Sequence, residues 1–271
     1  METARNAELR ALAQRLADAL PPVVIEVVLT GSVSRGIADE LSDIEMLVLT
    51  EEQISLNEAF ALCEAAGLTE TETWGDPATA TRRVHGYLDG QSIETIWWFP
   101  ALAEERYATT PSAEAIANGI ALRGGAWLAS ARARLADYPD ELVAERCEAA
   151  AERWGGWTPR GILTITRPDT ALARLEWLVE SAQRVLQIVF AVNRTHQPTA
   201  KRLGARVEAL AVKPERLAER IEEALAEPDP RRALLTMTEL QLDTLALAPT
   251  GPNVDRASGW LEGVARELGE T

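Results

Sequence analysis

The chain has 271 residues, of which 46% are hydrophobic and 25% are charged, values typical of a globular protein rather than a disordered one. Its 42 acidic and 27 basic side chains give a net charge of −15, which argues against a nucleic-acid-binding protein with a broad basic surface and against an anionic membrane as partner. With two distant cysteines, no signal-peptide core at the start and no apolar run near the ~20 residues of a membrane span, we expect a cytoplasmic protein.

The first 110 residues mix helical and strand patterns. Leucines three to four positions apart predict an amphipathic helix that ends at Pro21-Pro22. A run of β-branched residues follows and predicts a buried strand. Further on, Asp89-Gly90 between two strand patterns is typical of a hairpin turn. In chain order we expect a helix over 4–19, strands over 23–30 and 44–50, a helix over 55–66, and strands over 81–88 and 92–99.

The rest of the chain is helical in pattern, with breaks at proline and glycine. We therefore expect an α+β protein with a small mixed-sheet domain over 1–110 and an all-α helical bundle over 111–271. The helices are predicted at about 125–136, 139–153, 169–194, 201–211, 214–226, 231–247 and 254–268.

Two acidic residues lie two positions apart in the second predicted strand. Asp43 and Glu45 belong to the stretch SDIEMLVL, and residues i and i+2 of a strand point to the same face, so the two carboxylates lie side by side. Their charges repel each other, and a divalent cation between them relieves the repulsion. Because Mg²⁺ takes few protein carboxylates together with substrate phosphates, the pair predicts a magnesium site. The alternative is an ordinary strand with two solvent-facing acids.

The loop before this strand has the sequence GSVSRG and follows the first predicted strand. Gly31 lets the backbone approach a ligand closely, and exposed N–H groups with the Ser32 hydroxyl can bind phosphate. Arg35 either contacts phosphate or pairs with Asp39 or Glu40 on the surface. We therefore expect this loop to hold the anionic part of a nucleotide beside the metal.

A third acid is expected near the first two. Glu94 lies in the apolar strand SIETIWWF, where an acidic residue needs a reason. Asp89 is a rival, but in its turn it has a structural role. Trp98 shares the face of Glu94, and it either stacks on a substrate ring or packs in the core. We expect Glu94 to face the metal site.

This order of features resembles the DNA polymerase β-like nucleotidyltransferase superfamily, in which a strand, a GS loop and an S-D-x-[DE] strand precede a later strand with a third acid. The stretch GSVSRGIADELSDIEMLVL is most similar to antibiotic nucleotidyltransferases of the lincosamide and aminoglycoside types, which join a small catalytic domain to a helical C-terminal one. The match covers residues 24–49 well and 84–99 acceptably.

The resemblance implies roles for these residues. Asp43 and Glu45 would hold Mg²⁺, with two ions expected, and Glu94 would share a metal or act as the base. The second metal acid is Glu rather than the commoner Asp, as in some antibiotic-modifying members. The nucleotide contacts implied or suggested in this region are Gly31, Ser32, Arg35 and Ser42.

The helical part holds two further candidates. Asn193 ends an apolar stripe, and it either makes a helix-end hydrogen bond or contacts the substrate. Lys201 opens the next predicted helix, where positive charge is unfavourable unless an anion is bound, so it either contacts the triphosphate or is solvated. The segment 190–201 also looks like the phosphate-contacting helix and loop of related nucleotidyltransferases.

The function predicted from the sequence is Mg-dependent transfer of a nucleoside monophosphate, AMP from ATP in the first place, onto a hydroxyl of a small molecule such as an antibiotic, with release of pyrophosphate. One alternative is a macromolecular acceptor, tRNA or protein, and another is a non-catalytic NTP-binding sensor of the same fold. Residues 1–110 carry 19 acidic and 7 basic side chains, which disfavours tRNA. We expect a monomer or a homodimer.

Overall fold

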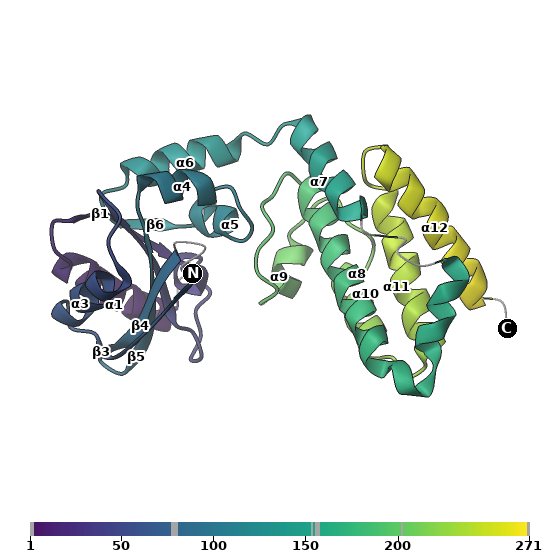
Figure 1. The fold of residues 1–271 in the computed structure, drawn as a ribbon, viewed down its shortest axis with the longest axis horizontal. Coiled ribbons are helices and arrows are strands. Elements are labelled where there is room, and N and C mark those ends of the chain that lie inside the picture. Colours follow the sequence, from purple (N-terminus) through teal and green to yellow (C-terminus); the bar gives the residue numbers. More distant parts are fainter. Residues whose placement is uncertain (1–2, 77–80, 153, 155–157, 202, 270–271) are drawn as a thin grey trace. The chain divides into compact units, whose positions relative to one another are not determined.

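A computed structural model of the chain describes all residues except 1–2, 77–80, 153, 155–157, 202 and 270–271. The chain forms two compact units, Met1–Asp137 and Tyr138–Thr271 (Figure 1). The first unit contains a mixed sheet with helices, and the second is helical. The predicted α+β fold class is therefore confirmed.

The first unit begins with a helix whose bounds match the prediction. Thr3 caps it by accepting a hydrogen bond from the backbone N–H of Asn6, which satisfies one of the free donors of the first turn. The elements of this unit are α1 Ala4–Ala19, β1 Val24–Thr30, α2 Gly31–Ser34, β2 Ile44–Thr50, α3 Leu56–Ala65, β3 Thr69–Asp76, β4 Thr81–Leu88, β5 Gln91–Trp98, α4 Pro100–Arg106, α5 Ser112–Ala117, β6 Ile120–Arg123 and α6 Ala126–Ala136.

The strands form one sheet in the order β3-β4-β5-β2-β1-β6. β2 and β5 run parallel, whereas the other neighbouring pairs are antiparallel. The predicted hairpin between β4 and β5 is confirmed, and both Asp89 and Gly90 have positive φ, as a two-residue hairpin turn of type I′ requires. The parallel pair in the middle of the sheet carries the acidic residues.

The boundary between the units lies at Asp137, later than the predicted boundary at residue 110. The short strand β6 pairs with β1, so the chain returns to the sheet after residue 110. Ile116 of α5 and Leu128 of α6 then pack in a buried cluster with Val28 of β1. Residues 111–137 therefore complete the first unit rather than begin the helical one.

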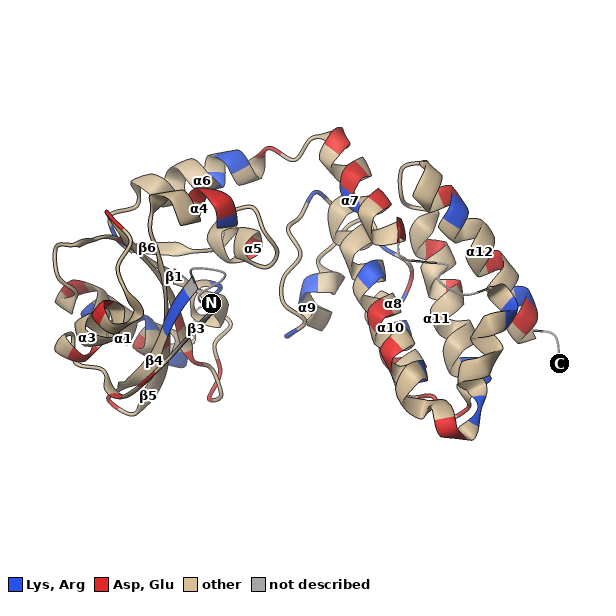
Figure 2. Ribbon diagram, viewed as in Figure 1, with Lys and Arg blue, Asp and Glu red and all other residues tan. Residues whose placement is uncertain are grey.

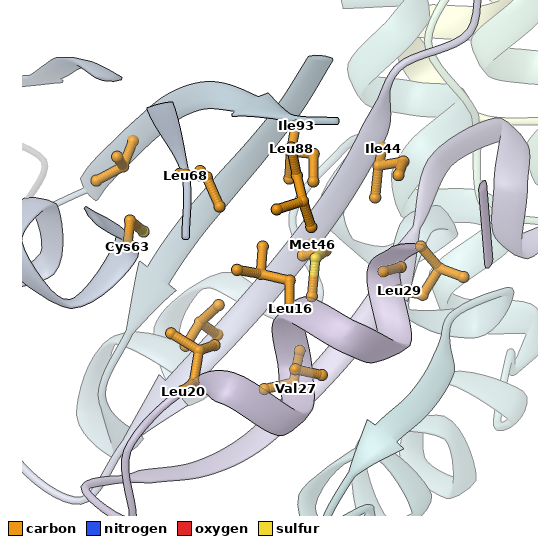
Figure 3. Packing of buried hydrophobic residues seen from close by; sticks show 14 of the residues in the cluster. Leu16, Leu20, Val27, Leu29, Ile44, Met46, Cys63, Leu68, Leu88 and Ile93 are labelled. Atoms are coloured by element: carbon orange, nitrogen blue, oxygen red, sulfur yellow. The ribbon is translucent and has the colours of Figure 1, made fainter. Parts of the chain in front are cut away.

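Each face of the sheet has its own apolar core. Leu16 of α1 and Cys63 of α3 pack on one face with Met46 and Ile93, and Figure 3 shows Leu16 beside Met46. On the opposite face, the helices α4, α5 and α6 pack over one end of the strands, where Trp98 is buried. The acidic residues lie toward the other end of that second face, and a functional site can form there.

The second unit is a set of packed helices. Its elements are α7 Asp140–Glu152, η1 Pro159–Thr166, η2 Pro168–Thr170, α8 Ala171–Val192, α9 Leu203–Glu208, α10 Leu217–Ala226, α11 Pro230–Leu245 and α12 Pro252–Gly269, where η denotes a 3₁₀ helix. Apolar side chains of α8, α11 and α12 form its buried core. In the described part of the chain, no helix combines the length and the apolar character needed to cross a membrane.

Candidate functional site

The acids of β2 and β5 meet in the parallel pair. Glu45 and Glu94 are direct partners in the register of the two strands, so both side chains lie on the same face of the sheet. The same row continues to Thr30 of β1, the partner of Glu45, and to His85 of β4, the partner of Glu94. Asp43 directly precedes β2, two residues before Glu45. The register puts Glu45 and Glu94 on one face, whereas the shared face of Asp43 and Glu45 stays a prediction, because Asp43 lies outside β2.

Gly31 lies against the carboxylate of Glu45. The glycine has a φ of +70°, and a Cβ atom built on it would fall 1.9 Å from Oε2 of Glu45. Thr30, just before it, donates a hydrogen bond of 3.2 Å from its hydroxyl to the backbone carbonyl of Glu45. The GS loop is thus placed directly at the acidic pair. Its first position favours glycine because of the backbone conformation, and a larger residue there would displace the Glu45 carboxylate.

Ser42 has a structural role in the turn before Asp43. Its hydroxyl accepts a hydrogen bond from the N–H of Asp39 and donates one to the Asp39 carboxylate, both 2.9 Å long. Its own N–H donates to the Asp39 carbonyl. Ser42 is buried by these contacts. They account for the serine without a nucleotide, so its predicted nucleotide contact stays a prediction, whereas Ser32 is half-buried in α2 next to Gly31.

Arg35 has an ion-pair partner that its sequence neighbourhood does not reveal. Its Nη1 lies 3.5 Å from Oε2 of Glu114, which is buried in α5. The expected phosphate contact and the expected surface pairs with Asp39 or Glu40 stay predictions beside this contact. The sequence does not reveal this partner, because Glu114 lies beyond residue 110 in a segment that the sequence assigned to the other domain.

Glu94 also has a basic partner on the neighbouring strand. Its Oε1 lies 2.9 Å from Nη1 of Arg83, and the Glu94 side chain is 16% exposed. One step along the same face, His85 Nε2 lies 2.9 Å from Ser92 Oγ. Sequence reasoning missed Arg83, although the Asp89-Gly90 hairpin fixes the register that places it near Glu94.

Asp43, Glu45 and Glu94 are the acids expected to bind a metal ion. Among the described residues, no group of three His, Cys, Asp or Glu side chains is placed to hold a metal together. The expected three-acid group is therefore not assembled in the described part of the chain, where Glu94 forms an ion pair with Arg83. Asp43 lies two residues before Glu45, directly before β2, and the two side chains offer two oxygen ligands, which fits Mg²⁺, since this ion is bound through one or two carboxylates and substrate phosphates.

Trp98 packs in the apolar cluster under α4, α5 and α6. It is 7% exposed, and its ring makes an edge-to-face contact with Trp127, with centroids 6.2 Å apart. The alternation along β5 does place it on the face of Glu94, as predicted. The covering helices bury it, so core packing, one of its two expected roles, accounts for its contacts.

The two candidates of the second unit differ in their contacts. Asn193 ends α8, and its amide donates to the carbonyls of Val189 and Val212, at 2.7 and 2.6 Å, and accepts from the N–H of Val212. It therefore has the helix-end role weighed above. Lys201 is exposed in a turn before α9. Residue 202, which the predicted helix 201–211 included, lies outside the described residues.

Arginines of the second unit mostly bind acids and helix-end carbonyls. Figure 2 shows acidic and basic residues interspersed along its helices. Arg220 pairs with Asp243, and Arg256 donates to the carbonyls of Trp154 and Glu152. These contacts join different segments of the second unit, so its arginines have a structural role.

No protein-family model and no curated protein matches the chain. Among the solved structures that match is a nucleotidyltransferase-like protein from Exiguobacterium sibiricum, with 12% sequence identity and a TM-score of 0.32 over 98% of this chain and 74% of that one. A TM-score at this level carries no argument for a common fold or activity.

Proposed function

We propose that the first unit is a Mg²⁺-dependent nucleotidyltransferase that moves a nucleoside monophosphate, with ATP as donor, onto a hydroxyl of a small molecule. The position of Glu45 carries the proposal. It lies two residues after Asp43, beside Glu94 in the parallel strand and against Gly31 of the GS loop. The alternative, an ordinary turn and a strand with solvent-facing acids, gives no reason for a glycine to lie against the carboxylate of Glu45.

The residues divide the work as follows. Asp43 and Glu45 hold Mg²⁺, and the GS loop binds the β- and γ-phosphates through its N–H groups and Ser32. When bound, the ion neutralises the triphosphate and lowers the pKa of the attacking hydroxyl. The acceptor oxygen forms a bond to the α-phosphorus while the bond to the pyrophosphate oxygen breaks. Glu94, held by Arg83, accepts the hydroxyl proton.

The acceptor class is a small molecule such as an antibiotic. Residues 1–110 carry 19 acidic and 7 basic side chains, so the region around the site repels polyanions and attracts cations. A hydroxyl-bearing amine, such as an aminoglycoside or a lincosamide, suits this field. Nucleic acid does not.

Pyrophosphate release from Mg-ATP tests the proposal when a panel of aminoglycosides, lincosamides and other hydroxyl compounds is supplied. Asp43→Asn should remove the release, because the amide no longer holds the metal. Asp89→Asn is the matched control, since Asn-Gly suits the same hairpin turn. Wild-type protein that releases no pyrophosphate with any acceptor, or an Asp43→Asn variant as active as wild type, would contradict the proposal.

A further inference from the structure

We propose that Asn6 and Gln91 are positioning residues of the candidate site. Asn6 holds the loop after Gly31, and Gln91 holds the peptide before Asp43. The inference rests on the proposed function, because it names what fixes that same site. Neither residue belongs to the GS loop or to the acidic strand, and their side chains reach these segments from α1 and from the first residue of β5.

Asn6 connects both ends of the segment that follows the GS pair. Its Nδ2 donates to the carbonyl of Val33 at 3.1 Å, and its Oδ1 accepts from the N–H of Ala38 at 3.3 Å. The side chain is buried, at 1% exposure. Because its donor and its acceptor are used in opposite directions, the amide has one orientation, and the loop can shift only if a buried hydrogen bond breaks.

Gln91 acts at the other end of the same loop. Its Nε2 donates to the carbonyl of Ser42 at 2.9 Å, which is the peptide that leads into Asp43. Arg5 of α1 donates to Oε1 of Gln91, so the amide nitrogen must face Ser42. The chain of contacts from Arg5 through Gln91 to Ser42 therefore sets the direction in which the strand with Asp43 begins.

A cavity of about 550 Å³ lies along this chain of contacts, with Arg5 and Gln91 in its lining. Gln91 is half-buried at that surface, so its replacement leaves the core packing of the sheet in place. Gln14 offers a matched control, and it lies in α1, the helix that also carries Arg5 and Asn6. Its Nε2 donates to the carbonyl of Leu122 at 3.1 Å, a bond of the same kind that leads to β6 and not to the loop.

The experiment compares Gln91→Ala, Asn6→Ser and Gln14→Ala with the wild type by two titrations of the full chain. The first uses Mn²⁺ alone, and the second uses a non-hydrolysable ATP analogue at saturating Mg²⁺. We expect Gln91→Ala to weaken Mn²⁺ binding roughly five- to tenfold, because the Asp43 end of the loop moves. We expect Asn6→Ser to weaken mainly analogue binding by a similar factor, because the GS loop moves. Gln14→Ala should change neither affinity.

Thermal unfolding of each variant separates positioning from general stability. Gln91→Ala and Gln14→Ala should lower Tm by similar amounts, while Mn²⁺ affinity changes in the first variant alone. If the wild type binds Mn²⁺ and the analogue and Gln91→Ala binds both as Gln14→Ala does, the inference is wrong and the proposed function stands. If the wild type binds neither, the proposed function fails and takes the inference with it.

Discussion

Glu45 faces Glu94 across the parallel strands β2 and β5 as its direct register partner. Two carboxylates in this position repel each other, and the protein compensates one of them with Arg83. The other lies against the backbone of Gly31, where a Cβ atom would displace its carboxylate group. A carboxylate with a glycine loop beside it offers an oxygen ligand to a metal ion that also binds phosphates.

Gly31→Ala should destabilise the first unit more than Gly36→Ala. Both glycines have a φ near +70°, so alanine strains the backbone by ~1 kcal/mol at either position. A Cβ at Gly36 meets nothing within 4 Å, whereas a Cβ at Gly31 overlaps Glu45 Oε2. Because only the end of the flexible Glu45 side chain must move, we expect the free energy of unfolding to fall by up to about 1 kcal/mol more in Gly31→Ala, as measured by urea denaturation.

A double variant tests the cause of that difference. Glu45→Ala removes the overlapping carboxylate, so the pair Gly31→Ala with Glu45→Ala should recover the additional loss and keep only the backbone strain. Equal destabilisation by Gly31→Ala and Gly36→Ala would mean that the Glu45 carboxylate moves away from the added Cβ at no cost in stability.

Arg83→Gln should increase the affinity of the site for Mn²⁺ by roughly two- to threefold, because a positive charge beside the acids is removed. The release of Glu94 also offers a further carboxylate to the ion. Arg15→Gln is the matched control, since Arg15 forms its ion pair with Asp89 at the hairpin turn. The affinities can be compared by titration at low salt. An unchanged affinity in Arg83→Gln would show that the Arg83–Glu94 pair does not act on the metal.

The two thiols should make stability fall at high pH. Burial raises the pKa of Cys63 and of Cys147 from 9.0 to about 11. A folded-state pKa above the unfolded one gives a stabilisation that is complete below pH 9 and is lost as the pH rises to 11. Each thiol accounts for up to about 2 to 3 kcal/mol of this change.

Urea unfolding at pH 7.5 and pH 10.5 measures the loss. In Cys63→Ala the free energy of unfolding of the first unit should fall less between these pH values than in the wild type, because the thiol is missing. Every other titrating group is the same in both proteins. The same comparison applies to Cys147→Ala in the second unit. An identical pH dependence in variant and wild type would mean that the thiol is not buried.

Asn193→Ala should affect stability and not nucleotide binding. The amide makes hydrogen bonds that close α8 onto the segment at Val212, and their loss should cost the second unit about 1 to 2 kcal/mol. Binding of a Mg-ATP analogue should stay the same. A large loss of analogue affinity without loss of stability would restore the substrate contact that the sequence suggested.

Local pattern was enough to predict much of the first unit. The leucine spacing located α1, the Asp89-Gly90 turn located the hairpin, and strand alternation placed Glu94 and Trp98 on one face. The strands β3 and β6 were missed, because TETETWGD alternates polar residues at a sheet edge and IALR has four residues. The absence of β6 from the prediction moved the domain boundary to residue 110.

Contacts between distant segments were not predictable from spacing. Glu114 reaches Arg35 from a helix beyond the predicted domain, and Asn6 reaches the loop after Gly31 from the start of the chain. Trp98 was placed on the correct face, but the helices that bury it follow later in the sequence. Periodicity shows which face a residue occupies, and only the assembled fold shows what covers that face.

Titration of a non-hydrolysable ATP analogue with and without Mg²⁺ tests the central claim most directly, with Glu45→Gln and Glu72→Gln as the compared variants. Glu72 is an exposed acid of β3 in the same row of the sheet, as the partner of His85. The wild type and Glu72→Gln should bind the analogue in a Mg²⁺-dependent way, and Glu45→Gln should lose that dependence. Binding by Glu45→Gln equal to wild type, or no binding by the wild type, would contradict the account.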